Sequence, residues 1–297
     1  MKRKPELVVN AQAILGEGPT WDSKDGHQYW IDISGRNLHI HDPKARTNRQ
    51  VDLGQFIGSA AVKSTRELVV ALEKGFFFLD LGSEKLTAIV DPEAHIPGNR
   101  FNDGKCDPRG RFWSGTQPSD GTGGATEQRG GSALYRLDKD HTVKKMVNGV
   151  SISNGIAWSL DNTVMYYIDS RVPAVAAYDF DLETGDIRNR RYPIEIPPGH
   201  GSPDGMTIDE EGMLYVAEWD GYQVSKWDPR SGKQVDSISF PIAKITSCCF
   251  GGPKLDQLYV TTARVGVKPA DTAQGDAGSV FCIDVGVSGA ESYRYAG

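Results

Sequence analysis

Four short segments of the chain place an oxygen-bearing side chain directly before a glycine and a run of mostly apolar residues. The oxygen-bearing residues are Glu17, Asp103, Asn154 and Asp204. Carboxylate and amide oxygens are hard ligands, which suit Ca, Mg and Mn, and Zn also accepts carboxylates. If the fold brings the four segments together, these residue types predict the binding of a divalent cation.

The four segments belong to a repeat that runs through the chain. Two further segments, starting at Gly58 and Thr246, fit the same frame without the oxygen ligand, so the frame begins at residues 17, 58, 103, 154, 204 and 246. Repeats of ~40–50 residues are typical of the four-stranded blade of a β-propeller. The pattern predicts an all-β, six-bladed propeller that forms a single domain over residues 1–297, with strands near Leu7 or Phe281 closing the ring.

Within each repeat, a polar turn separates the first apolar run from a second run rich in aromatic and β-branched residues. Such runs are typical of buried strands. The second runs lie at 28–32, 67–71, 111–115, 164–169, 213–217 and 257–261, and third runs include 37–41, 133–137, 175–179 and 223–227. No segment shows a sustained helical period, which favours an all-β fold.

The first strand of each propeller blade lines the central channel, so the four oxygen-bearing residues are expected to form a ring at one end of it. Three carboxylates at such close range would repel one another and would be poorly solvated. A divalent metal ion resolves that conflict, and catalytic sites commonly combine three protein ligands with an open position for water. The sequence therefore predicts a metal site in the central channel.

Second strands run antiparallel to first strands, so the loops that follow them should surround the metal end of the channel. The longest of these loops, from Gln117 to Ser132, is rich in Gly and Ser and is expected to be a flexible lid or wall. Three basic residues also follow second strands, namely Lys74, Arg171 and Arg264. They could hold an acidic group of a substrate.

Composition argues against several classes of partner. The net charge is −6, whereas a nucleic-acid-binding protein needs a basic face. No apolar run approaches the ~20 residues of a membrane span, and the basic start at Met1 is not followed by the apolar stretch of a signal peptide. The four cysteines show neither zinc spacing nor a disulfide framework. They are expected to be buried, reduced thiols in a cytoplasmic protein.

The segments around the oxygen-bearing residues resemble a known family over nearly the whole chain. They are LGEGP at 15–19, NRFNDGK at 99–105, SNGIAW at 153–158, YIDS at 167–170 and PDGM at 203–206. In this order and spacing they are similar to the regucalcin/gluconolactonase (senescence marker protein) family. The resemblance implies a propeller that holds one divalent metal ion and hydrolyses sugar lactones in carbohydrate metabolism.

The resemblance also implies roles for individual residues. Glu17, Asn154 and Asp204 match the metal ligands of the family. Arg100 and Asn102 match its substrate-binding positions. For the ion itself, Ca, Zn, Mn, Mg and Fe(II) all stay open, since availability and geometry decide among them.

Three further residues are expected to touch the substrate. An acidic contact of the family falls near Asp120, where the local sequence departs from the family pattern. Asp103 belongs to the predicted ring, and Arg171 lies on the rim. With its basic neighbours, Arg171 would suit a lactone that carries an acidic group.

Hydrolysis of a lactone needs an electrophile, a water molecule and a group that takes the proton of that water. A metal ion can polarise the carbonyl. Asp204 is predicted to be the catalytic residue that accepts the proton, and Asp103 is the alternative base. The expected partner is a small-molecule sugar lactone, with the particular sugar and the oligomeric state open.

Two other functions stay open at this level. One is a non-catalytic propeller that binds calcium or a ligand, and the other is a propeller esterase or phosphotriesterase, which tends to use more metal ligands. Turnover of gluconolactone-type substrates above their spontaneous hydrolysis, abolished by a chelator and by Asp204→Ala, separates the lactonase from the non-catalytic propeller.

Overall fold

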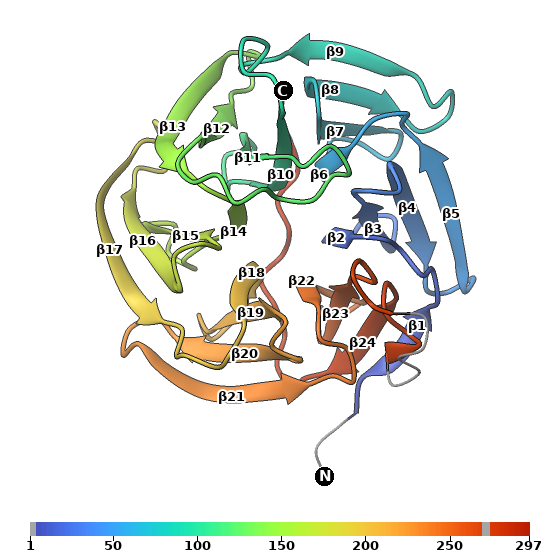
Figure 1. Cartoon of the computed structure of the whole chain (residues 1–297), viewed down its shortest axis with the longest axis vertical. Coiled ribbons are helices and arrows are strands. Elements are labelled where there is room, and N and C mark those ends of the chain that lie inside the picture. The colour runs from blue at the N-terminus through green and yellow to red at the C-terminus, as the bar shows by residue number, and fades with distance from the viewer. Residues whose placement is uncertain (1–3, 269–273) are drawn as a thin grey trace.

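Six antiparallel sheets of four strands each surround a central axis in the computed structural model, which describes residues 4–268 and 274–297 (Figure 1). The predicted all-β, six-bladed propeller is therefore confirmed. The described part of the chain contains strands and no α-helix, and so no helix long and apolar enough to cross a membrane.

In the first three blades, consecutive strands run from the axis outward, so that the first strand is innermost. The strands are β2 (Gly16–Asp22), β3 (His27–Asp32), β4 (Asn37–Asp42) and β5 (Thr47–Asp52); β6 (Ile57–Val62), β7 (Glu67–Leu72), β8 (Gly75–Asp80) and β9 (Leu86–Val90); and β10 (Asn99–Cys106), β11 (Phe112–Pro118), β12 (Ser132–Leu137) and β13 (Val143–Val150).

Blades four and five follow the same order, and the sixth blade takes its outermost strand from the start of the chain. The strands are β14 (Ser153–Trp158), β15 (Val164–Asp169), β16 (Ala174–Phe180) and β17 (Ile187–Glu195); β18 (Ser202–Ile208), β19 (Leu214–Trp219), β20 (Gln223–Asp228) and β21 (Lys233–Ser239); and β22 (Ile245–Gly251), β23 (Gln257–Thr262), β24 (Val280–Asp284) and β1 (Glu6–Val9). Both strands that were predicted to close the ring do so together, because Leu7 in β1 pairs with Phe281 in β24.

The hydrophobic core lies between the blades and not within any one of them. Six clusters of buried apolar side chains each combine residues of two neighbouring blades. Phe76 of the second blade packs on Phe101 of the third, with ring centroids 4.6 Å apart. Trp21 of the first blade stacks on Tyr259 of the sixth at 5.8 Å. Packing that continues around the whole ring holds the six inner strands in fixed positions about the axis.

All four cysteines are free thiols, as predicted, and three of them are buried. Cys248 and Cys249 are neighbours in β22 and face opposite sides of the sheet, so they belong to different clusters. Burial raises the pKa of the Cys249 thiol, which favours the neutral form.

The segment after β24 crosses the end of the channel where the inner strands finish (Figure 1). The backbone amide of Ala290 donates to the carbonyl of Ile208 at 3.1 Å, and that of Tyr295 donates to the carbonyl of Val62 at 2.8 Å. Tyr295 is also 2% exposed, packed against the second and third blades. The C-terminal segment thus covers this end of the channel, which leaves the opposite end for access to a site.

Candidate functional site

Each inner strand carries one more residue than the neighbouring strand that pairs with it. In β14, Ser153 pairs with Asp169 and Ile156 pairs with Tyr167, so two residues of β14 lie opposite one residue of β15. The other five inner strands contain the same irregularity. These are β-bulges, which change the direction of side chains and are common beside functional sites. In β10, β14 and β18 the bulge residues include a polar side chain, whereas the bulge in β2 lies at Gly18 and Pro19, directly after Glu17.

The β-bulges show that one residue of β10 was assigned wrongly to the predicted ring. The bulge residues are Asn102 and Asp103 in β10, Asn154 and Gly155 in β14, and Asp204 and Gly205 in β18. Asn102, and not Asp103, therefore occupies the position of Asn154 and Asp204. The sequence frame was aligned on the residue before each glycine, and it slipped by one residue in β10 because two polar residues precede Gly104 there.

The repeated glycines are explained by close approach of neighbouring inner strands. A Cβ atom on Gly155 would lie 2.8 Å from the backbone oxygen of Asp204 in the next blade, and one on Gly205 would overlap the side chain of Ser247. Gly58 is in the same situation against the backbone of Phe101. Since no side chain fits between these strands, the channel is narrow at this height and the polar residues are held close together.

Two carboxyl groups, from the first and the fifth blade, meet in this narrow part. Glu17 of β2 and Asp204 of β18 are 4% and 5% exposed, and their carboxyl groups lie within hydrogen-bonding reach of each other. Burial, and then the neighbouring charge of Asp103, raises the pKa of Glu17 to about 8. Burial and the charge of Glu17 raise the pKa of Asp204. Among the described residues, Oδ1 of Asp204 has no hydrogen-bond partner.

Two amides lie beside this carboxyl pair. Nδ2 of Asn102 donates to Oδ1 of Asn154 at 2.9 Å and to the carbonyl of Ser153 at 2.7 Å. Nδ2 of Asn154 in turn donates to Oγ of Ser170 at 2.8 Å. Both Asn102 and Asn154 are 4% exposed. The third and fourth blades are thus joined by side-chain amides. Ser170 also belongs to this network, and no role was predicted for it beyond its place in the motif at 167–170.

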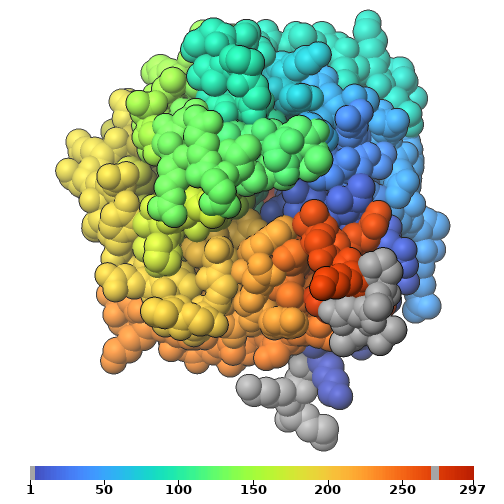
Figure 2. Space-filling model, viewed as in Figure 1, coloured from blue at the N-terminus to red at the C-terminus, as the bar shows by residue number. Residues whose placement is uncertain are grey.

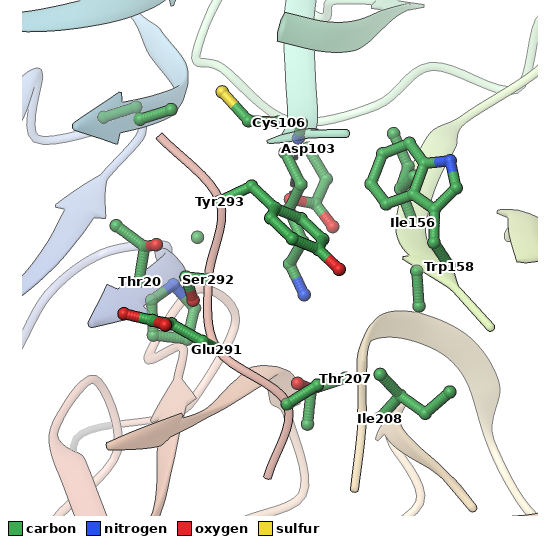
Figure 3. A pocket seen from close by; sticks show the side chains of 18 of the residues that line it. Thr20, Asp103, Cys106, Ile156, Trp158, Thr207, Ile208, Glu291, Ser292 and Tyr293 are labelled. Carbon is green, nitrogen blue, oxygen red and sulfur yellow. Dashed lines mark hydrogen bonds between the residues drawn. The ribbon is translucent and has the colours of Figure 1, made fainter. Parts of the chain in front are cut away.

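Asp103 lies deeper in the channel than the other predicted ring members. It lines a cavity of about 100 Å³ under the C-terminal segment, together with Lys105, Thr207 and Tyr293 (Figure 3). Its Oδ1 accepts from the amide of Gly104 at 2.7 Å. No three His, Cys, Asp or Glu side chains of residues 4–268 and 274–297 gather closely enough to hold a metal ion. A compact oxygen site here therefore consists of two carboxylates and amide oxygens.

Arg100 is buried between the site and the loop that follows β11, at 2% exposure. Its Nε donates to the carbonyl of Gly123 at 2.6 Å, and its Nη1 donates to the carbonyl of Phe101 at 2.8 Å and to Oδ1 of Asn102 at 2.7 Å. Burial lowers the pKa of Arg100 to about 10, which leaves the guanidinium protonated at neutral pH. Its Nη2 donates to the side-chain oxygen of Gln117 at 2.8 Å when that amide is turned to accept, so Arg100 mainly fixes Asn102, Gln117 and the loop that contains Gly123.

That loop, residues 119–131, lies over part of the central opening (Figure 2). Oδ1 of Asp120 accepts from the amides of Thr122 and Gly124 at 2.8 and 3.0 Å, which closes a local turn. Nη2 of Arg171, from the fourth blade, donates to the carbonyl of Thr126 at 3.1 Å and forms an ion pair with Glu127 at 3.3 Å. Asp120 and Arg171 are therefore parts of the wall above the site, and their contact with substrate stays a prediction.

Six radial blades, with carboxylate and amide oxygens gathered at one height of the channel, define a β-propeller with a polar site on its axis. The model of the family described as the SMP-30/Gluconolactonase/LRE-like region matches residues 15–264. The chain is 38% identical to "Putative sugar lactone lactonase YvrE" of Bacillus subtilis over 98% of both chains, and 39% identical to regucalcin of Xenopus laevis over 99% of both.

A solved structure of a calcium-binding protein, regucalcin, from Agrobacterium tumefaciens superposes with a TM-score of 0.92 at 28% identity, covering 99% of this chain and 97% of that one. The chain belongs to the SMP-30/gluconolactonase family. Family membership confirms the resemblance that the motifs indicated. It also confirms the predicted class of enzyme, a lactonase-type hydrolase.

Proposed function

We propose that the protein hydrolyses a sugar lactone to the sugar acid with the help of one divalent metal ion held by Glu17, Asn154 and Asp204. The observation that carries the proposal is the buried carboxyl pair of Glu17 and Asp204. Two acids at this range, with one oxygen of Asp204 lacking a partner among the described residues, form a site that is incomplete without a positive charge.

The residues present fit such an ion. Two carboxylates and one amide oxygen are the hard donors that Ca, Mg and Mn prefer, and three protein ligands leave positions for water and substrate. When bound, the ion would polarise the lactone carbonyl and acidify a water molecule. Family relatives support the assignment, since the Agrobacterium tumefaciens structure is described as a calcium-binding protein.

Asp204 is the residue that moves the proton in this proposal. Its carboxylate takes a proton from the attacking water as the oxygen of that water bonds to the carbonyl carbon. The bond from that carbon to the ring oxygen then breaks, and the same proton returns to the leaving oxygen. In the metal-free protein, burial and the neighbouring charge of Glu17 raise the pKa of Asp204. A bound cation would favour its carboxylate, which is the form that accepts a proton from water.

The walls above the carboxyl pair would orient the sugar. Arg100 and Asn102 would contact the sugar if a substrate hydroxyl replaced a hydrogen bond that their N–H groups make to Gln117 or Ser153. Asp120 and Arg171 lie in and against the covering loop. Asp103, below the pair, would contact the far side of the ligand. Because Arg171 is already paired with Glu127, an acidic lactone would have to compete with that carboxylate.

Removal of the metal tests the function directly. Protein treated with a chelator and then dialysed is expected to hydrolyse glucono-δ-lactone at the spontaneous rate, because the lactone carbonyl is no longer polarised. Activity should return when Ca, Zn, Mn, Mg or Fe(II) is added back singly. Rates are measured by following acid release at constant pH, with a protein-free reaction as the baseline. Full activity in metal-free protein would refute the proposal.

The raised carboxyl pKa values also predict how metal-free protein responds to pH. Between about 4.5, the ordinary pKa of Glu17, and about 8, its value in the folded protein, the folded state binds more protons than the unfolded state. The free energy of unfolding should therefore fall as pH rises through this window, by on the order of a few kcal/mol. Urea denaturation at pH 5 and pH 8.5 in the presence of a chelator measures it.

The matched control is Glu17→Gln, which removes the titrating group and keeps the shape of the side chain. This variant should show a smaller fall in stability between the two pH values. Saturation of the wild-type protein with metal should also reduce the fall, because a bound cation favours the ionised carboxylates. A variant with the same pH dependence as the wild type would show that Glu17 is not the group responsible.

A non-catalytic calcium-binding propeller is the second candidate, favoured by the description of the Agrobacterium tumefaciens protein as calcium-binding. The two candidates differ in one measurement. A binding protein would take up Ca²⁺ and leave glucono-δ-lactone at its spontaneous rate of hydrolysis, whatever ion is supplied.

A further inference from the structure

Four hydrogen bonds form a continuous chain from Arg100 to the fifth blade. In order, Nη1 of Arg100 donates to Oδ1 of Asn102 at 2.7 Å, Nδ2 of Asn102 donates to Oδ1 of Asn154 at 2.9 Å, Nδ2 of Asn154 donates to Oγ of Ser170 at 2.8 Å, and Oγ of Ser170 donates to the carbonyl of Pro203 at 2.6 Å. The last of these residues directly precedes Asp204. This series of hydrogen bonds therefore runs along the whole side of the site that Asn102 and Asn154 form.

The first and last groups of this hydrogen-bond series allow its N–H and O–H groups to point in only one direction. A guanidinium has donors and no acceptor, so Arg100 can only donate, and a backbone carbonyl such as that of Pro203 can only accept. Asn102 must then turn its oxygen toward Arg100 and its NH₂ group toward Asn154. A flipped amide at either asparagine would place two donors or two acceptors face to face.

The direction of these hydrogen bonds determines which atom Asn154 offers to a cation. Its NH₂ group is held by Ser170, so its oxygen faces the interior of the site. Among the described residues this oxygen accepts one hydrogen bond from a side chain, that of Asn102, and a carbonyl oxygen has two lone pairs. One lone pair is thus open on the side where the proposed ligand must bind. With the amide reversed, the site would present NH₂ to the metal and would repel it.

We propose that Ser170 is a positioning residue for the metal site, which orients the Asn154 amide without touching metal or substrate. The inference rests on the proposed function, because it assigns a metal to this site. Ser170 is itself well placed, since it follows β15 directly and its backbone amide donates to the carbonyl of Ile152 at 3.1 Å. Partners of this kind typically change metal affinity ~10–100-fold when they are removed.

The test is the affinity of metal-free protein for Mn²⁺ and Ca²⁺, measured by titration calorimetry. Ser170→Ala should raise the dissociation constant by about 10–100-fold, because the NH₂ group of Asn154 then loses its acceptor and Asn102 alone holds the amide in place. Ser170→Thr keeps the hydroxyl and should stay close to the wild-type value. Ser59→Ala is the matched control, because it removes a buried hydroxyl that bonds Ser114 in the neighbouring blade and takes no part in the chain.

A double-mutant cycle separates orientation from general damage to the fold. Asn154→Asp replaces the amide by a carboxylate, whose two oxygens are equivalent ligands, so adding Ser170→Ala to it should change metal affinity little. A purely structural role for Ser170 would weaken binding equally in both backgrounds. Thermal unfolding in chelator confirms that each variant is folded before it is titrated.

The outcomes distinguish this inference from the proposed function. If wild-type protein binds a divalent ion and hydrolyses lactone while Ser170→Ala has unchanged affinity, only the role of Ser170 is wrong. Equal losses of affinity in the wild-type and Asn154→Asp backgrounds also overturn it. If the wild type binds no divalent ion, the proposed function fails and the inference falls with it.

Discussion

Replacing Asp204 with Asn is expected to lower kcat/KM for glucono-δ-lactone by at least ~100-fold, and by ~10,000-fold if Asp204 is the sole base. The substitution keeps the size of the side chain but removes its ability to take a proton, and it also weakens one of the three proposed metal ligands. The measurement is initial rate at saturating metal, so that a loss of metal affinity is compensated by concentration.

Stability separates loss of chemistry from loss of fold in this variant. Asp204→Asn removes a buried acid next to Glu17, so metal-free protein should become more stable at neutral pH while its activity falls. Asp103→Asn is the comparison, because Asp103 is the alternative base. If that variant loses the activity and Asp204→Asn retains it, the assignment of the base is reversed.

The largest effect on stability is expected from Asp107→Ala, outside the site. Asp107 is fully buried and accepts from Nε of Arg111 at 2.5 Å and from Nε1 of Trp113 at 2.9 Å. The same guanidinium donates to the carbonyl of Leu182 in the next blade at 2.8 Å. Removal of the carboxylate leaves a buried positive charge without its partner, so the free energy of unfolding should fall by about 3–5 kcal/mol.

Urea denaturation measures this change, and Asp179→Ala is the matched control. Asp179 also pairs with an arginine, Arg191, at 2.7 Å, but both side chains are more than two-fifths exposed. Water screens that pair, so its loss should cost less than about 1 kcal/mol. Similar losses in the two variants would show that the buried pair of Asp107 and Arg111 contributes no more than a surface ion pair.

The repeat in the sequence was sufficient to predict the architecture. Blade number and the order of strands within the first five blades follow from the spacing of similar segments, which also predicts a ring of Glu17, Asp103, Asn154 and Asp204 about one axis. This works because a propeller is built from near neighbours in sequence, so local strand patterns carry most of its topology. The free cysteines were also predicted, because their spacing matches neither a zinc site nor a disulfide framework.

The sequence does not show which residue of each inner strand occupies the position at the bulge, because no single residue type marks a β-bulge. Asp103-Gly104 looks like Asn154-Gly155 in sequence, yet the register of β10 with β11 puts Asn102 in the equivalent place. Pairing between strands decides this register, and one extra residue moves every following side chain to the other face.

Local pattern, repeated at a regular interval, accounts for the all-β radial scaffold and for the set of acidic and amide residues that it gathers. It does not reveal which of those residues meet, that Arg100 is used mainly to hold Asn102 and the covering loop, or that Ser170 contacts Asn154. These are contacts between blades or between a strand and a distant loop. They emerge only in the folded chain, because they depend on packing and hydrogen-bond direction across segments that are far apart in sequence.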